Sequence, residues 1–206
     1  MEEALYSKYG FFNNEKVRSK KSGDFLTSPE VSKYFGKILN QWIQKNNLDL
    51  NIVEFGSGTG SLIEQINTEN KFAVELSSTA RVELSKKNIQ NVASLEDLIF
   101  KESDLVFGNE VLDNIPCSVA VFKDNKWYEK VVNLEDDSFS YDFVNARKEA
   151  IDWIETNQLK GDVNIDIEVQ TNIDKFLENI IHNLNPKTIL FFDYGFEQKD
   201  RAERKY

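Results

Sequence analysis

The chain has 206 residues, 40% hydrophobic and 12% aromatic, which is enough for one folded domain with a proper core. Its net charge of −10 argues against a nucleic-acid partner and favours a basic protein or a cationic side chain. Cys117 is the only cysteine, so disulfides are excluded and a reducing, cytoplasmic compartment is expected. No apolar run is long enough for a membrane span. His182 is the only histidine, and a single histidine and cysteine exclude a His/Cys metal cluster.

Residues 1–28 are expected to form an N-terminal arm and a loop that covers a ligand. Four aromatic side chains should pin the arm to the main body: Tyr6, Tyr9, Phe11 and Phe12. Thr27 or Ser28 can cap a helix whose first turn holds Pro29. An apolar stripe from Val31 to Ile43, at helical spacing, predicts that this helix packs on the core.

The stretch from Asn51 to Gly60 organises the whole chain. A short buried strand over 52–55 runs into three glycines at alternate positions, Gly56, Gly58 and Gly60, with Ser57 between the first two. An apolar helical pattern follows, so a strand, a glycine turn and a helix N-terminus predict a nucleotide-type ligand site.

The glycine spacing narrows the choice of ligand. A dinucleotide fingerprint has its third glycine one residue later, and no Gly-Lys-Ser/Thr follows for a P-loop. The pattern from Glu54 to Gly60 resembles motif I of S-adenosylmethionine methyltransferases, where the loop wraps the methionine half of the cofactor and Glu54 supports the loop or the ligand's amino group. A tight turn without a ligand remains the alternative.

A second strand is predicted over 71–76, and it ends in Glu75 and Leu76. Glu75 lies about 20 residues beyond the glycines, where a carboxylate can accept both ribose hydroxyls of a nucleoside. The alternative for Glu75 is a solvated strand end.

A helix over 78–88 and a weak strand at 91–95 come next, and a fourth strand over 103–108 opens into Asn109, Glu110 and Asp113. Ligands bind at the carboxyl ends of strands in open α/β sheets. If the turn is helical, Glu110 and Asp113 share one face. The alternative role for both acids is capping of a helix N-terminus.

The next segment changes character. Residues 117–146 predict a β-hairpin insertion, with a further strand at 139–144. Helices are expected around 146–156 and from Thr171 onward, and an apolar fifth strand at 188–195 is expected to be central. The expected fold is a single domain over 1–206: a three-layer, Rossmann-like α/β fold with a mostly parallel sheet centred on 52–55.

Several separated blocks resemble one family, the MidA-like S-adenosylmethionine-dependent methyltransferases, bacterial relatives of the mitochondrial complex I assembly arginine methyltransferase. Beyond the glycine loop and Glu75, the matching blocks are Ala4–Phe12, Gly23–Ser32, Asn109–Pro116, Glu168–Gln170 and Phe192–Gly195. They follow the family order across nearly the whole chain. The chain departs from the family in length, because family members continue through two further strands, so the sheet is expected to lack an edge and part of the acceptor pocket.

The resemblance implies S-adenosyl-L-methionine as cofactor and a protein arginine, on a respiratory-complex subunit, as acceptor. Thr27, Leu76 and Asn109 would then join the glycine loop at the cofactor, and Glu110 and Asp113 would orient a guanidinium. The main alternative is a non-catalytic S-adenosylmethionine-binding or assembly protein that self-associates through an exposed sheet edge. An NAD-type oxidoreductase is disfavoured by the glycine spacing and by the lack of an acid/base histidine.

Overall fold

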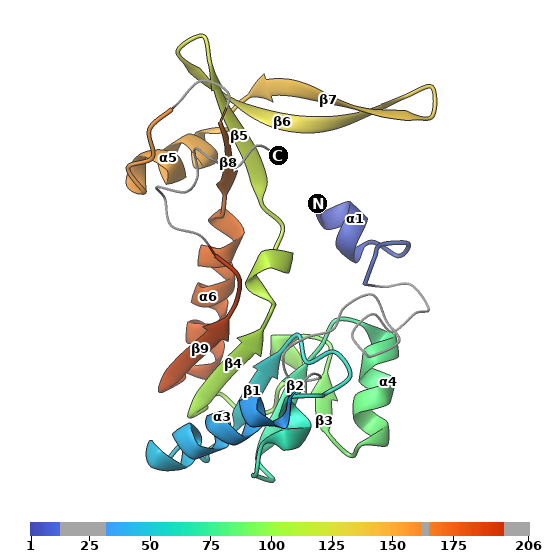
Figure 1. Ribbon diagram of the computed structural model, residues 1–206, viewed down its shortest axis with the longest axis vertical. Coiled ribbons are helices and arrows are strands. Elements are labelled where there is room, and N and C mark those ends of the chain that lie inside the picture. The colour runs from blue at the N-terminus through green and yellow to red at the C-terminus, as the bar shows by residue number, and fades with distance from the viewer. Residues whose placement is uncertain (13–31, 162–164, 196–206) are drawn as a thin grey trace. The chain divides into compact units, whose positions relative to one another are not determined.

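The computed structural model describes residues 1–12, 32–161 and 165–195. These residues form two compact units, each with its own sheet (Figure 1). The parallel-sheet unit contains 2–114 and 177–194, and the antiparallel-sheet unit is built from 115–176. The prediction of a single domain over 1–206, with an arm at 1–28, stays a prediction.

Five parallel strands form the first sheet, in the order β3-β2-β1-β4-β9. Their bounds are β1 Ile52–Phe55, β2 Lys71–Val74, β3 Gln90–Val92, β4 Leu105–Asn109 and β9 Thr188–Phe192. All four residues of β1 are buried, as expected for a central strand of a parallel sheet. The parallel sheet centred on 52–55 is therefore confirmed.

Helical segments precede or connect these strands. They are α1 Glu2–Tyr6, α3 Lys33–Lys45, α4 Ser78–Lys86 and α6 Thr171–Leu184, with 3₁₀ turns η1 Ile63–Gln65, η2 Leu95–Asp97 and η3 Leu112–Asn114. The side chain of Ser32 caps α3 by accepting from Tyr34 N–H, and Ser77 caps α4 in the same way. The predicted caps at Thr27 and Ser28 lie outside the described residues.

Only part of the predicted apolar stripe of α3 lies in the core, because Tyr34 and Ile38 are 73% and 64% exposed. Leu39 and Ile43 pack with Ile52 of β1 and with Leu105 and Phe107 of β4. On the same side of the sheet, α4 contributes Leu84, which packs with Ala73 of β2 and Ile63 of η1. This packing fixes the carboxyl ends of β1, β2 and β4 relative to one another.

Four strands, in the order β7-β6-β5-β8, form the antiparallel sheet. Their bounds are β5 Ser118–Lys123, β6 Lys126–Glu135, β7 Ser138–Asn145 and β8 Asp166–Val169, and α5 spans Lys148–Thr156. Asp124-Asn125 and Asp136-Asp137 have positive φ angles of 47–61°, the signature of tight two-residue hairpin turns. Buried Glu129 of β6 accepts from the Arg147 guanidinium and backbone N–H, which ties β6 to the start of α5.

The structure differs from the prediction in three elements. The expected helix after the glycine loop is only the single turn η1, because residues 66–69 leave the helical path. The insertion is larger than 117–146, since β8 pairs with β5 and α5 packs on the same small sheet. β9 was expected to be central, yet among the described residues it pairs with β4 alone and each of its residues is half-buried.

Within the part of the chain that the structure describes, no helix has the length and apolar character that a bilayer crossing requires.

Candidate functional site

The candidate site lies at the carboxyl edge of the parallel sheet, where the loops after β1, β2, β4 and β9 meet (Figure 1). The loop after β1 touches the loop after β4, because a Cβ added at Gly56 would lie 2.7 Å from Val111 Cγ2. Glu75 reaches the loop after β1, and Asp193 reaches the turn after β4. Four separated segments of sequence thus converge on one end of the sheet.

The glycine loop adopts the backbone conformation that its sequence predicts. Gly56, Gly58 and Gly60 have φ angles of +62°, +51° and +80°, a region that side-chain-bearing residues rarely adopt. Gly56 is exposed and Gly58 is partly exposed, so their backbone is accessible to a ligand. Ser57 between them is buried, and its hydroxyl donates to the Glu54 carbonyl at 3.1 Å, which holds the loop closed on β1.

Glu75 links the second strand to this loop. Its Oε2 accepts from Gly58 N–H at 2.9 Å and its Oε1 accepts from Ser77 N–H at 2.8 Å. Burial raises the pKa of this carboxyl above its ordinary value, and the two backbone donors oppose that rise. Each carboxylate oxygen carries a second lone pair, so both can still accept from a ligand's hydroxyl groups.

Glu54 occupies the buried end of β1, directly before the glycines, and is 2% exposed. Burial raises the pKa of its carboxyl to about 8, although hydrogen bonds from Ser57 and the backbone of Ile63 act in the opposite direction. Its Oε2 has no hydrogen-bond partner among the described residues. A buried oxygen without a partner is costly, so this atom is suited to receive a donor from a ligand.

The turn after β4 is fastened by Asp193, which follows β9. One oxygen, Oδ2, accepts the backbone N–H groups of Val111, Leu112 and Asp113 at 3.0, 2.7 and 3.3 Å. Glu110 N–H in turn donates to the Phe192 carbonyl at 2.8 Å. Asp193, in the block Phe192–Gly195, therefore fixes the backbone of the turn in the block Asn109–Pro116. The sequence did not predict this contact.

Glu110 and Asp113 lie in this turn, but not on a helical face. Glu110 has a φ of +55°, in the left-handed region, and only 112–114 form a 3₁₀ turn. Asn109 Nδ2 donates to Glu110 Oε1 at 3.2 Å. Burial and the negative charges of Asp193 and Glu110 raise the pKa of the Asp113 carboxyl, so three acids crowd one small region. Such a cluster favours a cation.

Tyr6 connects the cofactor side of the site to this acidic turn, and sequence reasoning missed it. Its hydroxyl donates to the Asn114 carbonyl at 2.8 Å. Burial raises the pKa of the phenol to about 12, and the negative charges of Glu75 and Asp113 add to the rise. The tyrosine was read only as an anchor of the arm. Its place inside a family block was the signal that could have found it.

Arg81 of α4 was also missed. Its Nη1 lies 2.7 Å from the carbonyl oxygens of both Glu75 and Leu76 and donates to them, which fixes the chain as it leaves β2. Leu76 itself presents an exposed apolar side chain. Of the eleven residues singled out from the sequence, ten lie at the ends of β1, β2 and β4 or in the loops that follow them, and Thr27 lies outside the described residues.

These residues fit a nucleoside that carries a positive charge. An accessible glycine backbone, a two-oxygen acceptor at Glu75 and the unpartnered oxygen of Glu54 supply acceptors for hydroxyl and amino groups. Among the described residues, no group of three or more His, Cys, Asp or Glu side chains is placed to hold a metal ion.

Comparison with known proteins agrees with a nucleoside-type cofactor at this site. A family model described as "Putative S-adenosyl-L-methionine-dependent methyltransferase" matches residues 34–205. A crystal structure of a Burkholderia thailandensis protein bound to S-adenosyl-homocysteine matches 95% of the chain at 21% identity, with a TM-score of 0.78. A second, native crystal structure from the same organism matches 99% at 23% identity and a TM-score of 0.75. The chain spans 57% of each of these proteins, and the likeness establishes the fold.

Proposed function

This chain belongs to the S-adenosyl-L-methionine-dependent methyltransferase family whose model it matches, and we propose that it transfers a methyl group from S-adenosyl-L-methionine to an arginine side chain of a protein. The observation that carries the proposal is the contact between Glu75 and Gly58, which joins the nucleoside-binding acid to the glycine loop. We place the chain in the MidA-like branch on the separated blocks described above.

The cofactor supplies an activated methyl group, so the protein's main contribution is to bind and orient two reactants. Glu75 would accept the ribose hydroxyls, and the backbone at Gly56 and Gly58 would lie along the methionine half. Leu76 would contact the base, and Glu54 would accept from the amino group. Thr27 and Asn109 would complete the cofactor's surroundings.

The acceptor is inferred from the acidic turn. Glu110, Asp113 and Asp193 repel one another electrostatically, as the raised pKa of Asp113 reflects, and a cation would relieve this repulsion. A guanidinium stays charged and offers a planar fork of donors, which suits two carboxylates better than a lysine ammonium does. Glu110 and Asp113 would hold it so that one nitrogen faces the methyl group.

Proteins that carry arginines on their surface are the acceptors we propose, including a respiratory-complex subunit in a reducing, cytoplasmic compartment. The net charge of −10 supports a basic protein partner over a nucleic acid. The competing function is a cofactor-binding assembly factor without transferase activity.

The first prediction tests the assignment of the acceptor side. Glu110→Gln should abolish transfer of labelled methyl groups to an arginine-containing peptide, because the guanidinium loses one of its two charged partners and is no longer oriented toward the methyl group. S-adenosyl-L-methionine affinity, measured by calorimetric titration, should stay within a few-fold of the wild-type value. Glu102→Gln serves as a matched control, since Glu102 is an exposed acid just before the amino end of β4.

Transfer by wild type to the arginine peptide, with none to the same peptide carrying lysine, supports the proposed acceptor. Unchanged turnover in Glu110→Gln contradicts the role of Glu110. Cofactor binding by wild type with no label transferred to any protein of a cell lysate favours the assembly-factor alternative.

A further inference from the structure

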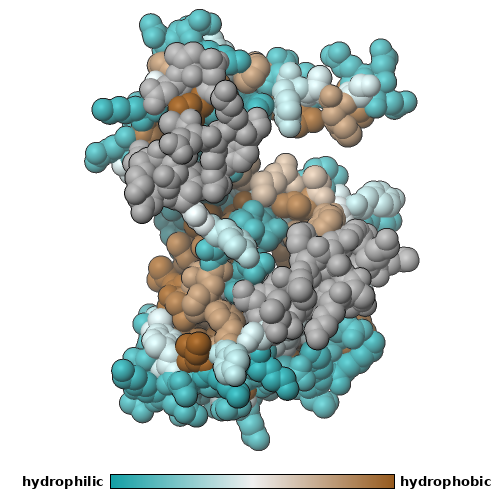
Figure 2. All heavy atoms as spheres, in the orientation of Figure 1, coloured by the Kyte–Doolittle hydropathy of each residue, from teal (hydrophilic) through white to brown (hydrophobic). Residues whose placement is uncertain are grey.

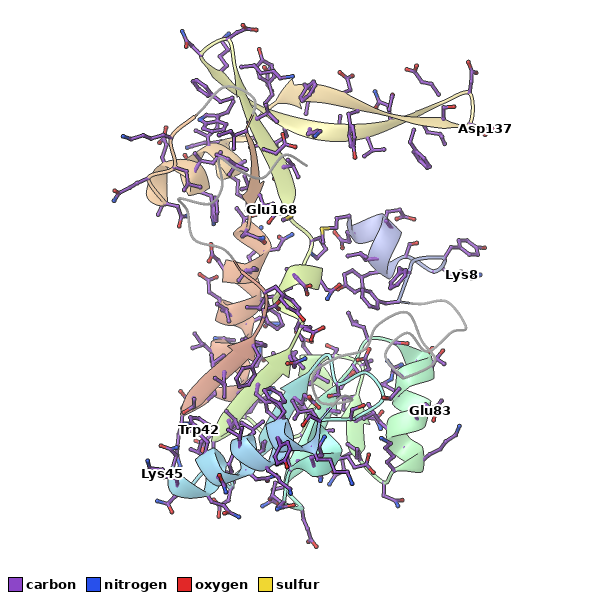
Figure 3. The ribbon with its side chains drawn as sticks, viewed as in Figure 1. Lys8, Trp42, Lys45, Glu83, Asp137 and Glu168 are labelled. Carbon is purple, nitrogen blue, oxygen red and sulfur yellow. The ribbon has the colours of Figure 1, made fainter. Side chains whose placement is uncertain are left out.

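The β6–β7 hairpin of the antiparallel-sheet unit exposes an apolar surface that no described residue covers. All eight residues of β7 are exposed, and β7 pairs with β6 alone among the described strands. Cross-strand pairing places five apolar side chains on one face, with exposures between 37% and 79%: Val132, Leu134, Phe139, Tyr141 and Phe143. Figure 3 shows the hairpin as a two-stranded ribbon with Asp137 at its tip, and Figure 2 shows brown apolar surface among its polar residues.

Such an edge is a template for another strand. Most natural edge strands carry lysine or proline, or are covered. β7 contains neither residue, and its single charge is Asp142. Beyond Lys130, β6 pairs with β7 alone among the described strands, and such a two-stranded ribbon with an uncovered apolar face is only marginally stable in water. Both facts favour a partner that adds strands to β7.

The backbone shows which residues of β7 face the free edge. The two-residue turn Asp136-Asp137 closes on the pair Glu135 and Ser138, which makes Ser138 and every second residue after it face β6. Ala146 obeys this alternation, because its N–H donates to Trp127 of β6 at 3.1 Å. Phe143 belongs to the other set, and its N–H donates to Asp142 Oδ1 at 2.7 Å instead of to β6.

Phe139, Tyr141 and Phe143 therefore present both their backbone groups to the free edge and their side chains to the apolar face. We propose that β7 pairs antiparallel with β7 of a second copy of this chain, about a two-fold axis at Tyr141, to form a continuous sheet in the order β6-β7-β7-β6. The proposal does not depend on the methyltransferase activity.

This register is self-complementary. Tyr141 meets the partner's Tyr141, and Phe139 meets the partner's Phe143, so six aromatic rings line one face. On the other face, Asp142 lies opposite the partner's Ser140, and no like charges meet. A shift that places the axis at Asp142 would bring two carboxylates face to face, which is destabilising. A register shifted by a single residue would place the edge-facing backbone N–H and C=O groups of one β7 opposite residues whose backbone groups already bond to β6.

Lysine side chains also stabilise the aromatic face of β7 through cation–π contacts. Lys123 Nζ lies 3.3 Å from the centroid of the Phe143 ring, and Lys130 Nζ lies 4.6 Å from that of Tyr141. These cations engage the ring faces on each copy, so they stabilise the rings without standing between the two β7 strands. In the paired sheet, Phe143 N–H would donate to the carbonyl of the partner's Phe139 instead of to Asp142 Oδ1.

Cysteine cross-linking tests the register directly. In a Cys117→Ser background, which removes the only native cysteine, Tyr141→Cys should form a disulfide-linked dimer on mild oxidation, because directly opposed residues have Cα atoms about 5.5 Å apart. Phe139→Cys alone should not, since its two copies would be about 13 Å apart, four strand residues along. An equimolar mixture of Phe139→Cys and Phe143→Cys should cross-link.

Sedimentation equilibrium of the uncross-linked chain at micromolar concentration should give twice the 23.9 kDa chain mass. Tyr141→Pro should return it to the monomer, because proline removes an edge-facing N–H and leaves the bonds to β6 intact. Val132→Lys is the matched control, since it reduces the apolar character of the same face without altering the edge, and it should remain dimeric. Circular dichroism verifies folding of each variant.

A monomeric wild-type chain overturns the proposal, as does a dimer that persists in Tyr141→Pro. Cross-linking of Asp142→Cys to itself, with none for Tyr141→Cys, overturns the register. Equal dissociation by Tyr141→Pro and Val132→Lys would indicate non-specific apolar association and contradict strand pairing.

Discussion

Glu54 combines two demands at a single residue. It ends the central strand, where full burial makes a charge costly, and it stands next to the glycine loop, where an acceptor for a cationic ligand is useful. A carboxyl with a pKa of about 8 meets both demands, because it stays neutral when no cation is present and can lose its proton when one binds.

The second prediction concerns the pH dependence of stability. The folded chain keeps a proton on Glu54 up to about pH 8, whereas the unfolded chain releases it near the ordinary value of 4.5. The stabilisation that comes from the higher pKa of Glu54 in the folded chain is fully present below pH 4.5 and is lost as pH rises toward 8. The free energy of unfolding should therefore fall from about pH 5 to 8, with a limiting slope of about 1.4 kcal/mol per pH unit.

Urea denaturation at pH 5, 6.5 and 8 measures this slope. Glu54→Gln keeps the shape and removes the titration, so its stability should depend less on pH over the same range. Glu69→Gln is the control, because Glu69 is exposed, and it should reproduce the wild-type slope. A wild-type slope that Glu54→Gln leaves intact would assign the effect to other groups.

At the scale of elements, the site depends on how the ends of β4 and β9 are joined. Asp193 gathers three backbone N–H groups of the turn after β4, and Glu110 N–H returns a bond to the end of β9. This reciprocal connection holds Glu110 in a left-handed conformation that is otherwise unfavourable. The acids of the turn are thus positioned by an acid from another strand.

The third prediction removes the charge of that acid. Asp193→Asn keeps one acceptor oxygen but weakens charge-assisted bonds to the turn, so unfolding should become easier by about 1–3 kcal/mol. The loss of the Asp193 charge should also lower the pKa of Asp113, which carbon-detected NMR of the carboxyl can follow. Asp97→Asn, at an exposed acid, is the control. A lower melting temperature with an unchanged pKa of Asp113 would contradict the electrostatic part.

The elements also show what a sequence can predict here. α3 and α6 were predicted because apolar side chains recur every three or four residues, and β1 because a short apolar run precedes the glycines. The glycine loop was predicted because glycine adopts positive φ most readily. β8 was missed because its four residues form a strand only by pairing with β5, a contact distant in sequence. The position of β9 was wrong for a related reason, since an apolar run reports burial on both faces and not the number of neighbours.

The positions of the candidate site residues were predictable to a similar extent. Glu75 and Glu110 follow strands, so the carboxyl-end rule predicts that they lie at this edge of the sheet, and their roles stay a prediction. Tyr6 and Asp193 were not assigned to the site, because their roles depend on contacts 108 and 80–82 residues apart. No local pattern encodes a contact of that kind.

At the scale of the whole molecule, charge is the dominant property. A net charge of −10 creates a long-range field that attracts cations and is screened by salt over about 8–10 Å at 0.1–0.15 M ionic strength. The short-range contacts of a guanidinium inside the acidic turn are screened much less. The two contributions can therefore be separated by changing the charge of the acceptor outside the reacting arginine.

The fourth prediction uses two peptides with the same central arginine, one flanked by lysines and one flanked by glycines. The KM of the lysine-flanked peptide should rise several-fold between 50 and ~300 mM salt, because the long-range field is lost, whereas the KM of the glycine-flanked peptide should change little. Methyl-transfer assays at saturating cofactor measure both, and calorimetry of cofactor binding at each salt concentration is the control for the cofactor site. An equal salt dependence for the two peptides would show that the field of the whole molecule plays no part in selecting a basic acceptor.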